Sequence, residues 1–596
     1  MLSKYGPAMS YLAPLDEIAF TLNELAGLTD VAALPGCEEA SPELVAAVLE
    51  EAAKLARDVL APINHSGDRE GSRLVDGAVV TPSGWQQAYQ TFVEGGWNGL
   101  PFPQRFGGQG LPRLVATAVD ELWHAANMSF ALCPMLTQAA IEALMTHGSD
   151  ALQQTWLPKM VGGEWAGTMN LTEPQAGSDL GAIRARAEAD GDCYRLYGQK
   201  IFITYGDHDL TSNIVHMVLA RLPDAPPGVK GISMFLVPKF LLDENGDPGS
   251  RNDVRTVSLE HKLGIHASPT CVLAYGDTEG AVGYLVGERH RGLEYMFTMM
   301  NVARHAVGVE GLGIAERAYQ QALAYARERI QGRPIGASEQ ASIIHHPDVQ
   351  RMLMTMRCQV QVMRGLCYVW AAAFDAALRH TDAEERARQQ QFVDLLTPVV
   401  KGCCTEWGNE VASLGVQVHG GMGYVEETGA AQHFRDARIT TIYEGTTGIQ
   451  ANDLVGRKIL RDQGSGARQV MAMMRDIEDA AGSLDEIGDA YRDGLAQLDR
   501  ATAWTLEAAT ADPRLPAAVS FYYLKLWGVV CGGWLMAKSA RAAQGRLDDD
   551  DDVANADFYR DKLASASFYA THVMPQAAAL ANTIVHGAEA ALALRG

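Results

Sequence analysis

The sequence lacks the patterns that assign many enzymes to a metal or a nicotinamide cofactor. Among its 596 residues there is no Cys-x-x-Cys pair and no His and Cys spacing typical of a metal site. The Gly-rich loop of P-loop proteins and the Gly-x-Gly-x-x-Gly fingerprint of dinucleotide-binding domains are also missing. We therefore expect no metal centre and no Rossmann-type NAD domain.

Positive charge is scarce. The formal net charge is -23, so no broad basic field is available to attract nucleic acid or an anionic membrane surface. An anionic ligand would have to be held by individual arginines or by helix N-termini. The nine cysteines are irregularly spaced and odd in number, which is typical of free thiols in a reducing compartment.

The N-terminus lacks the apolar core of a signal peptide. Pro7, Pro14 and the acidic Asp16 fall where such a core would lie, and we expect no apolar run of membrane-spanning length further along the chain. A hydrophobic share of 47% with 20% charged residues is ordinary for a soluble protein. We expect a cytoplasmic protein without a transmembrane segment.

The pattern of apolar residues changes along the chain. Apolar residues recur at helical spacing at 43–63, 114–126, 139–146, 293–329, 349–378 and 392–418. Short segments rich in β-branched and aromatic residues predict strands at 165–171, 194–197, 200–205, 214–222, 232–238 and 254–259. This order predicts a mostly α-helical protein with a central antiparallel β domain.

Breaks in composition divide the chain into five expected parts. These are an N-terminal arm at 1–39, a helical domain at 40–160, a β domain at 161–285, a helical bundle at 286–463 and a C-terminal helical extension at 464–596. The extension begins at a Gly-Ser-Gly break and carries no catalytic constellation. Its run of five aspartates at 548–552 is typical of a solvated loop.

One carboxylate, Glu444, lies between an apolar run and a predicted helix at 449–460. Gly445 lets the backbone beside it turn sharply or approach a flat ligand. Thr447 and Gln450 have the spacing of a capping box, and the amides of a helix N-terminus favour nearby negative charge. Glu444 is therefore our candidate catalytic base, although this stretch alone also fits a solvated loop carboxylate beside an ordinary cap.

Several motifs, in order along the chain, resemble those of the acyl-CoA dehydrogenase family. They are LTEPQAGSD at 171–179, GQKIFIT at 198–204, QVHGGMGY at 417–424, FRDAR at 434–438 and YEGT at 443–446. Together they span most of the chain before the extension, and several motifs in order are more specific than one. The extension resembles the tail of the longer branch, which includes 3-(methylthio)propanoyl-CoA dehydrogenases and bacterial long-chain acyl-CoA dehydrogenases.

The resemblance implies an FAD enzyme of fatty-acid β-oxidation. It would oxidise an acyl-CoA thioester to the trans-2-enoyl-CoA, with Glu444 as the base, and pass its electrons to an electron-transfer flavoprotein. The hydride would leave the β-carbon for flavin N5, while the Glu444 amide and a ribityl hydroxyl bind the thioester oxygen. A carboxylate of ordinary pKa is a weak base for an α-proton, so burial is expected to raise the pKa of Glu444.

The resemblance also implies which residues bind cofactor and substrate. For FAD these are Leu171, Thr172, Gly177, Ser178, Phe202, Ile203, Thr204, Gln417, Gly420, Gly421, Thr446 and Arg329, the last reaching the pyrophosphate of a neighbouring subunit's FAD. For acyl-CoA they are Ser178, Asn301, Arg304 and Gly445. Taken singly, each of these residues also fits an ordinary role in the core, in a turn or on the surface.

Some positions depart from the family pattern. Ala303 stands where some members carry their catalytic glutamate, which leaves the loop position of Glu444. His266 replaces a usual arginine, either as a pH-sensitive donor or as a core histidine. Pro347 follows His346 where a His-Gln pair commonly contacts the adenylate, and proline has no amide to donate.

Three questions stay open at this point. The acyl chain length depends on side chains near 126–136 and 295–299, where Met296 and Met299 fit either a methylthio or a straight chain. An acyl-CoA oxidase is the nearest alternative activity, and a flavin-free acyl-CoA-binding or assembly protein is the alternative of another class. Because the extension would cover the face that a second dimer covers in shorter tetrameric relatives, we expect a homodimer.

Overall fold

The structure is a computed structural model that describes residues 11–475, 485–549 and 555–594. The first ten residues of the expected arm and Asp550, Asp551 and Asp552 of the aspartate run lie outside the described residues. The chain forms two compact units. The first comprises Met1–Glu50, Pro112–Glu121 and Arg304–Gly596, and the second comprises Glu51–Leu111 and Leu122–Ala303.

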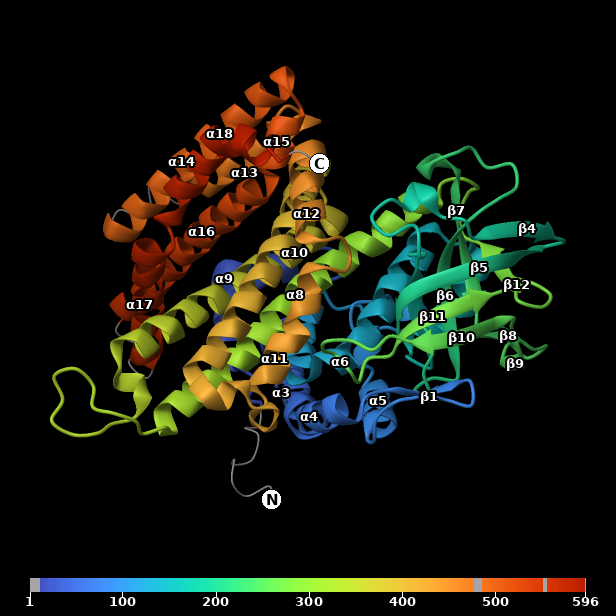
Figure 1. Ribbon diagram of the computed structural model, residues 1–596, viewed down its shortest axis with the longest axis horizontal. Coiled ribbons are helices and arrows are strands. Elements are labelled where there is room, and N and C mark those ends of the chain that lie inside the picture. Colours follow the sequence, from blue (N-terminus) through green and yellow to red (C-terminus); the bar gives the residue numbers. More distant parts are fainter. Residues whose placement is uncertain (1–10, 476–484, 550–554, 595–596) are drawn as a thin grey trace. The chain divides into compact units, whose positions relative to one another are not determined.

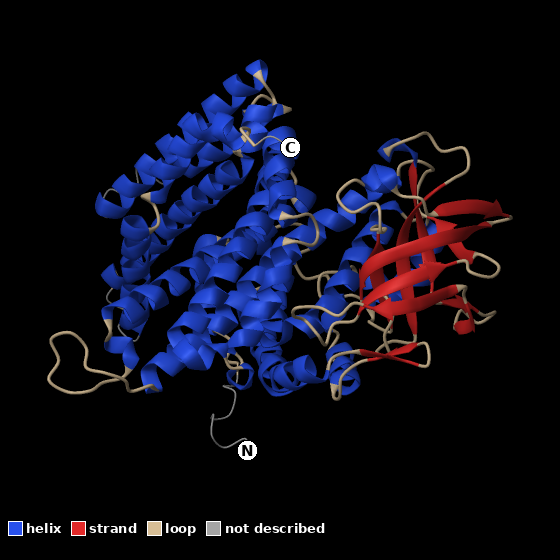
Figure 2. Cartoon of the chain, in the orientation of Figure 1, coloured by secondary structure: helices blue, strands red, loops and turns tan. Residues whose placement is uncertain are grey.

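The second unit contains the strands, which Figure 2 shows gathered in one sheet region. Their bounds are β1 (Arg73–Val75), β2 (Ala78–Val80), β3 (Trp165–Asn170), β4 (Arg186–Asp190), β5 (Cys193–Thr204), β6 (Asn213–Arg221), β7 (Ile232–Pro238), β8 (Phe240–Leu242), β9 (Pro248–Arg251), β10 (Val254–Leu259), β11 (Thr270–Tyr275) and β12 (Ala281–Leu285). The main sheet has the order β10-β11-β5-β12-β7-β6-β3, and β4 pairs with β5 and β6. It is mostly antiparallel, as expected, but β3 and β6 run parallel.

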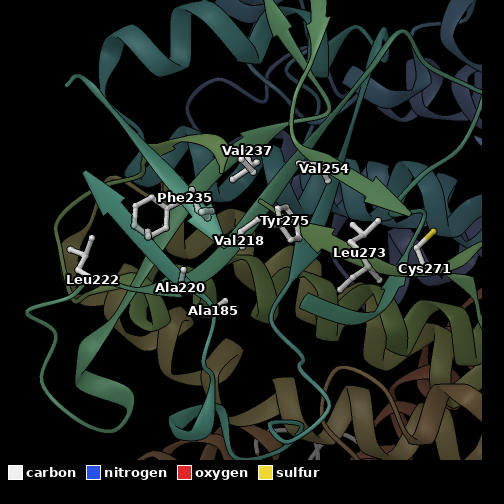
Figure 3. Close-up of a cluster of buried hydrophobic side chains, with 14 of the residues drawn as sticks. Ala185, Val218, Ala220, Leu222, Phe235, Val237, Val254, Cys271, Leu273 and Tyr275 are labelled. Atoms are coloured by element: carbon white, nitrogen blue, oxygen red, sulfur yellow. The ribbon is translucent and has the colours of Figure 1, made fainter. Parts of the chain in front are cut away.

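The centre of this sheet is buried on both faces. Every residue of β7 is buried, and all of β6 but its last residue. Val218 of β6 lies opposite Phe235 of β7, and Figure 3 shows both within a cluster that also includes Tyr275. Strands buried on both faces have continuous apolar sequences, which is why β7 could be predicted at its observed bounds.

Helix α6 (Arg113–His147) combines two helices across a kink. At Asn127 the backbone leaves the helical region, with φ -159° and ψ 88°. The Asn127 side chain accepts a hydrogen bond from the Phe130 amide at 3.1 Å, so it caps the second helix at its N-terminus. The second helix therefore begins well before the expected residue 139. The remaining helices of this unit are α4 (Ala61–Glu70), α5 (Trp85–Glu94) and α7 (Asp150–Val161).

Contrary to expectation, α6 is long and apolar enough to cross a membrane by length and composition. Its most apolar window has a mean hydropathy of 1.3, and 89% of that window is buried inside the protein. The core helix of a soluble protein passes the same test, so this burial explains the apolar run.

The first unit is helical, and α8 (Gly292–Glu328) enters it at Arg304. Its other helices are α1 (Leu15–Phe20), α2 (Leu28–Ala32), most of α3 (Pro42–Leu55), α9 (Pro347–Arg379), α10 (Ala383–His419), α11 (Ala430–Ala437), α12 (Thr447–Asp453), α13 (Ser465–Arg475), α14 (Asp485–Ala511), α15 (Arg514–Ala518), α16 (Ser520–Asp548), α17 (Ala556–His572) and α18 (Gln576–Ala591). Helix α12 continues as π-helix to Leu460, the end predicted from sequence.

The C-terminal helices belong to the core of the first unit. Helix α16 contacts α9, α10 and α12, and Figure 1 shows α14, α16, α17 and α18 stacked beside one another. Trp527, Val530 and Cys531 of α16 are almost completely buried. The extension therefore shares its hydrophobic core with the bundle that carries Glu444.

Candidate functional site

Glu444 lies on a short loop between a 3₁₀ turn (Arg438–Thr441) and α12. Its φ is +53° and that of Gly445 is +87°, so two consecutive residues are left-handed. A Cβ on Gly445 would lie 2.9 Å from Gln450 Nε2, which makes glycine necessary there. A left-handed conformation is costly for glutamate and persists only where the surroundings fix it.

The expected capping box is wrong in its residues. Thr446, not Thr447, is the N-cap of α12, and its hydroxyl accepts from the Ile449 amide at 3.3 Å. The Thr447 hydroxyl instead donates to Glu406 Oε1 at 2.6 Å. Gln450 donates through Nε2 to the Glu444 and Gly445 carbonyls, at 3.1 and 3.3 Å. The left-handed turn directs these two carbonyls to Gln450, which is why the capping box does not form.

Two cations act on the Glu444 carboxylate. Burial raises its pKa, while Arg304 of α8 and Lys401 of α10 lower it in part. Arg304 is buried, and its Nη1 lies 3.5 Å from Asp453 Oδ2, while its Nε has no hydrogen-bond partner in the part of the chain that the structure describes. Lys401 is fully buried and donates through Nζ to the Gly445 carbonyl at 2.7 Å. The structure thus joins Glu444, Gly445 and Arg304 in one electrostatic cluster.

Glu310 of α8 is a second buried carboxylate beside this loop. It accepts a hydrogen bond from the Tyr443 hydroxyl. Burial raises the pKa of Glu310 to about 8, with a smaller contribution from the charge of Glu444. Our sequence reasoning missed both Glu310 and Lys401. The signal was present, because each is the only charged residue in an apolar helical run, at 306–315 and 395–405 respectively.

Two groups of predicted flavin contacts, Leu171 with Thr172 and Phe202 to Thr204, lie close together in the second unit. The Ile201 amide donates to the Thr172 carbonyl at 3.0 Å, and Lys200 donates to the Leu171 carbonyl at 2.9 Å. The segment of Leu171 and Thr172 is therefore held beside the end of β5, where Ile203 is buried and Thr204 is half-buried.

Lys200 was not among the predicted site residues. It is fully buried and pairs with Glu173, whose carboxylate also accepts from the Arg184 and Ala185 amides. Burial lowers the pKa of Lys200 to about 8. An ammonium between a carboxylate and the Leu171 carbonyl fixes the path of that backbone.

Phe202 in the second unit and the glycine pair Gly420–Gly421 in the first unit are both exposed. Phe202 has a φ of +60° and is 59% exposed, so a large aromatic side chain lies at the surface of the second unit. Around Gly420 and Gly421, no heavy atom lies within 4 Å of an added Cβ. An aromatic ring is suited to pack on a flavin, and an open Gly-Gly turn leaves its backbone accessible to a phosphate.

Arg329 and the Gly420 turn lie at neighbouring places in the first unit. The rings of Tyr325 and His419 stack with centroids 4.4 Å apart, and these residues precede Arg329 by one helical turn and Gly420 by one residue. Arg329 and Gln417 are both exposed. Ile335 and Tyr424, which lie near Arg329 and Gly420 in sequence, are 91% and 88% exposed.

The other predicted residues are less closely joined. Gly177 and Ser178 are exposed in a turn of the second unit. Asn301 is half-buried on α8 and makes no side-chain hydrogen bond to any described residue. His266 is half-buried, with Nδ1 3.0 Å from Asp68 Oδ1 and Nε2 2.9 Å from the Lys262 carbonyl oxygen, so both ring nitrogens have partners within the second unit.

The chain matches the domain models of one enzyme family almost throughout. The matched descriptions are "Acyl-CoA dehydrogenase, N-terminal domain" at 43–164, "middle domain" at 168–278 and "C-terminal domain" at 290–460, followed by "Acetyl-CoA dehydrogenase C-terminal like" at 468–595. The last match covers the C-terminal extension.

Comparisons with individual proteins also match the chain to acyl-CoA dehydrogenases over nearly its whole length. The chain is 48% identical over 581 residues to 3-methylmercaptopropionyl-CoA dehydrogenase of Ruegeria pomeroyi, covering 96% of this chain and 97% of that protein. It is 33% identical to a butyryl-CoA dehydrogenase of Syntrophomonas wolfei, with 96% of each chain covered. The crystal structure of Caenorhabditis elegans ACDH-11 in complex with C11-CoA shares the fold, with a TM-score of 0.76, 21% identity and coverage of 96% of this chain and 94% of that one. The protein belongs to the acyl-CoA dehydrogenase family.

Proposed function

We propose that this protein binds FAD and dehydrogenates an acyl-CoA thioester between its α- and β-carbons, with Glu444 as the base. The observation that carries the proposal is the cluster around Glu444, a carboxylate in a strained backbone conformation with a raised pKa and with Arg304 and Lys401 beside it. Strained backbone and perturbed pKa values concentrate at functional sites.

The carboxylate of Glu444 takes the α-proton of the thioester. Burial raises the pKa of Glu444 and so makes it a stronger base than an exposed glutamate, while the positive charges of Arg304 and Lys401 favour its ionised form. We assign to the backbone amide of Glu444 the hydrogen bond that stabilises the developing negative charge on the thioester oxygen. FAD, when bound, would supply the acceptor for the hydride that leaves the β-carbon.

The residues of the second unit fit the flavin ring. Lys200 holds the Leu171 carbonyl, and the Ile201 amide holds the Thr172 carbonyl. The Leu171 amide and the Thr172 hydroxyl would therefore serve the cofactor edge, and the exposed Phe202 ring offers a packing surface. In the first unit, Arg329 and the open Gly420–Gly421 turn suit a diphosphate, because a guanidinium makes bidentate, charge-assisted hydrogen bonds with phosphate oxygens. We infer that this phosphate belongs to the FAD of a partner subunit.

Glu444→Gln tests this proposal. The amide keeps the shape of the side chain but cannot accept the proton, so flavin reduction by acyl-CoA in a stopped-flow instrument should slow by at least about 10²- to 10⁴-fold. FAD content and acyl-CoA affinity should stay close to wild type. Glu426→Gln is the matched control, because Glu426 pairs with Arg435 at the surface. A reduction rate within a few fold of wild type for Glu444→Gln would exclude Glu444 as the base.

For the substrate, we propose 3-(methylthio)propanoyl-CoA as the first candidate, since the relative that acts on it is 48% identical over nearly the whole chain. Met296 and Met299 of α8 are completely buried and can adapt to a thioether or to a straight chain. Turnover with the methylthio substrate and with straight acyl-CoA thioesters of increasing length decides between them. A clear preference for butanoyl-CoA or a longer chain would overturn this candidate.

We propose an electron-transfer flavoprotein as the acceptor and the cytoplasm as the location. The alternative acyl-CoA oxidase would form hydrogen peroxide during turnover without any added acceptor. Peroxide formation at the rate of acyl-CoA consumption would establish the oxidase, and its absence with rapid turnover on added electron-transfer flavoprotein supports the dehydrogenase. A colourless purified protein that binds no added FAD would instead favour the flavin-free alternative.

A further inference from the structure

Three side chains from two long helices and from α12 hold the loop that carries Glu444. Lys401 of α10 binds the Gly445 carbonyl at 2.7 Å, and Gln450 of α12 binds the Glu444 carbonyl at 3.1 Å. On the preceding residue, the Tyr443 hydroxyl donates to Glu310 of α8. Each residue from 443 to 445 is thus bound by a group from outside the loop.

The burial of Lys401 and Glu310 is not explained by packing. The side chains of both are almost fully enclosed within the first unit, where charges are costly unless they are paired. Lys401 has no carboxylate within ion-pair distance among the described residues, and its only hydrogen bond there is to the Gly445 carbonyl. Glu310 uses one oxygen for Tyr443, and its Oε1 has no hydrogen-bond partner in the described structure. Apolar residues at both places would suit an ordinary core better.

We propose that Lys401 and Glu310 are positioning residues for the base, which together hold Glu444 in its left-handed conformation from two sides. This inference rests on the proposed function, since it assumes that Glu444 takes the α-proton. Lys401 anchors the carbonyl that follows Glu444, and Glu310 anchors the side chain that precedes it. If one of these two anchors is removed, the loop can relax to an ordinary backbone conformation, and the Glu444 carboxylate moves.

Lys401 has a second, electrostatic effect on Glu444. Several neighbouring groups shift the pKa values of the ionisable residues around Glu444. They are Arg304 and Glu310 of α8, Lys401 and Glu406 of α10, Tyr443, Asp436 of α11, and Asp453 and Arg457 after the loop. Of the cations, Arg304 and Lys401 lower the pKa of Glu444. Removing the charge of Lys401 therefore raises the pKa of Glu444, and the pH at which the base ionises increases.

Glu310 acts as a neutral group near pH 7. Burial raises its pKa to about 8, so it is mostly protonated at neutral pH and accepts from Tyr443 through its carbonyl-like oxygen. A glutamine at position 310 can also accept a hydrogen bond from the Tyr443 hydroxyl, whereas a leucine cannot. This gives a matched pair of variants at one position, one of which retains the anchor.

The test measures flavin reduction by acyl-CoA against pH for Glu310→Gln, Glu310→Leu, Tyr443→Phe and Lys401→Met, together with acyl-CoA affinity and thermal melting. We expect Glu310→Gln to stay within a few fold of wild type at pH 7. Glu310→Leu and Tyr443→Phe should lose about 10²-fold in rate with little change in affinity, the loss typical of a displaced catalytic group. Lys401→Met should also shift the pH profile to higher pH, which a purely structural lysine would not do.

Two results would overturn the inference while leaving the proposed function intact. One is a Lys401→Met profile that overlays the wild-type profile in shape and midpoint. The other is a Tyr443→Phe enzyme as fast as Glu310→Gln, which remains informative if Glu310→Leu does not fold, because Tyr443→Phe removes only one oxygen. If Glu444→Gln still reduces flavin rapidly, the proposed function fails, and the two failures are thereby distinguished.

Discussion

Arg364 of α9 is the centre of a buried ion cluster in the first unit, and replacing it should destabilise the protein strongly. Its guanidinium lies 2.7 Å from Glu121 Oε1 and 2.6 Å from Glu316 Oε2, with Arg364 1% exposed and the two glutamates 0% and 6% exposed. The Tyr368 hydroxyl also donates to Glu121 at 2.6 Å. Arg364 therefore neutralises two carboxylates that water does not reach.

Arg364→Met keeps the bulk of the side chain but leaves both carboxylates without a counter-ion. Breaking a buried pair by removing one partner costs about 3–5 kcal/mol, because the remaining charge is buried without compensation. This is a large part of the 5–15 kcal/mol that typically separates folded from unfolded domains. We expect a marked fall in the denaturant midpoint, or faster unfolding if the transition is irreversible.

The assay is urea-induced unfolding followed by tryptophan fluorescence, with Arg560→Ala as the control. Arg560 pairs with Asp557 on α17, where the two side chains are 67% and 99% exposed, and such surface pairs often contribute nothing measurable. Replacing Arg364, Glu121 and Glu316 together by apolar residues should recover much of the lost stability. An Arg364→Met protein that unfolds with Arg560→Ala would refute the argument that this cluster depends on its central cation.

Three further predictions concern the cofactor, pH and assembly. Arg329→Ala should lose FAD during gel filtration. Its melting temperature should depend more on added FAD than that of wild type, because a ligand stabilises the folded state by mass action. If the variant retains as much FAD as wild type, Arg329 is only a surface charge. Burial raises the pKa of Glu310 to about 8, so wild type loses stability as the pH increases from the unfolded-state pKa of glutamate through this folded value. A glutamine at this position does not titrate, so the melting temperature of Glu310→Gln should rise relative to that of wild type between about pH 5 and 8. A difference in melting temperature that does not depend on pH contradicts this prediction. Light scattering should give the mass of a homodimer, and a tetramer would show that the C-terminal extension does not replace the second dimer.

Local sequence patterns were sufficient to predict the bounds of strands whose residues have a clear pattern of burial. The strand β7 was predicted at its exact bounds, 232–238, because both of its faces are buried and Gly231 and Pro238 limit it. Strand β10 was also predicted at its observed bounds, 254–259, although only its alternate residues Val254 and Thr256 are buried. The parallel pairs of the sheet, β3 with β6 and β4 with β6, depart from the antiparallel expectation, because pairing direction depends on connections that periodicity does not record.

The predictions that failed depended on backbone details or on distant partners. Asn127 could be recognised as polar but not as the cap of a second helix inside α6, because a cap is defined by a change in φ and ψ. Tyr443 and Glu310 are 133 residues apart in sequence, and Lys401 is 44 residues from Gly445. Such pairs meet only after the helices have packed, so Glu444 could be proposed as the base from sequence, whereas the contacts of Lys401 with Gly445 and of Glu310 with Tyr443 could not be predicted.

In our proposal the base lies on a loop, and this position explains why Glu444 would need Lys401 and Glu310 to hold its orientation. Ala303, the helix position at which some family members carry the glutamate, is completely buried here beside Arg304. A base on a helix would inherit its orientation from the backbone hydrogen bonds of that helix. Glu444 has no such scaffold, and its left-handed backbone is intrinsically unfavourable, so its orientation must come from side chains. Lys401 and Glu310 are two buried ionisable groups that the core itself does not require, which is the trade of stability for function expected at an active site.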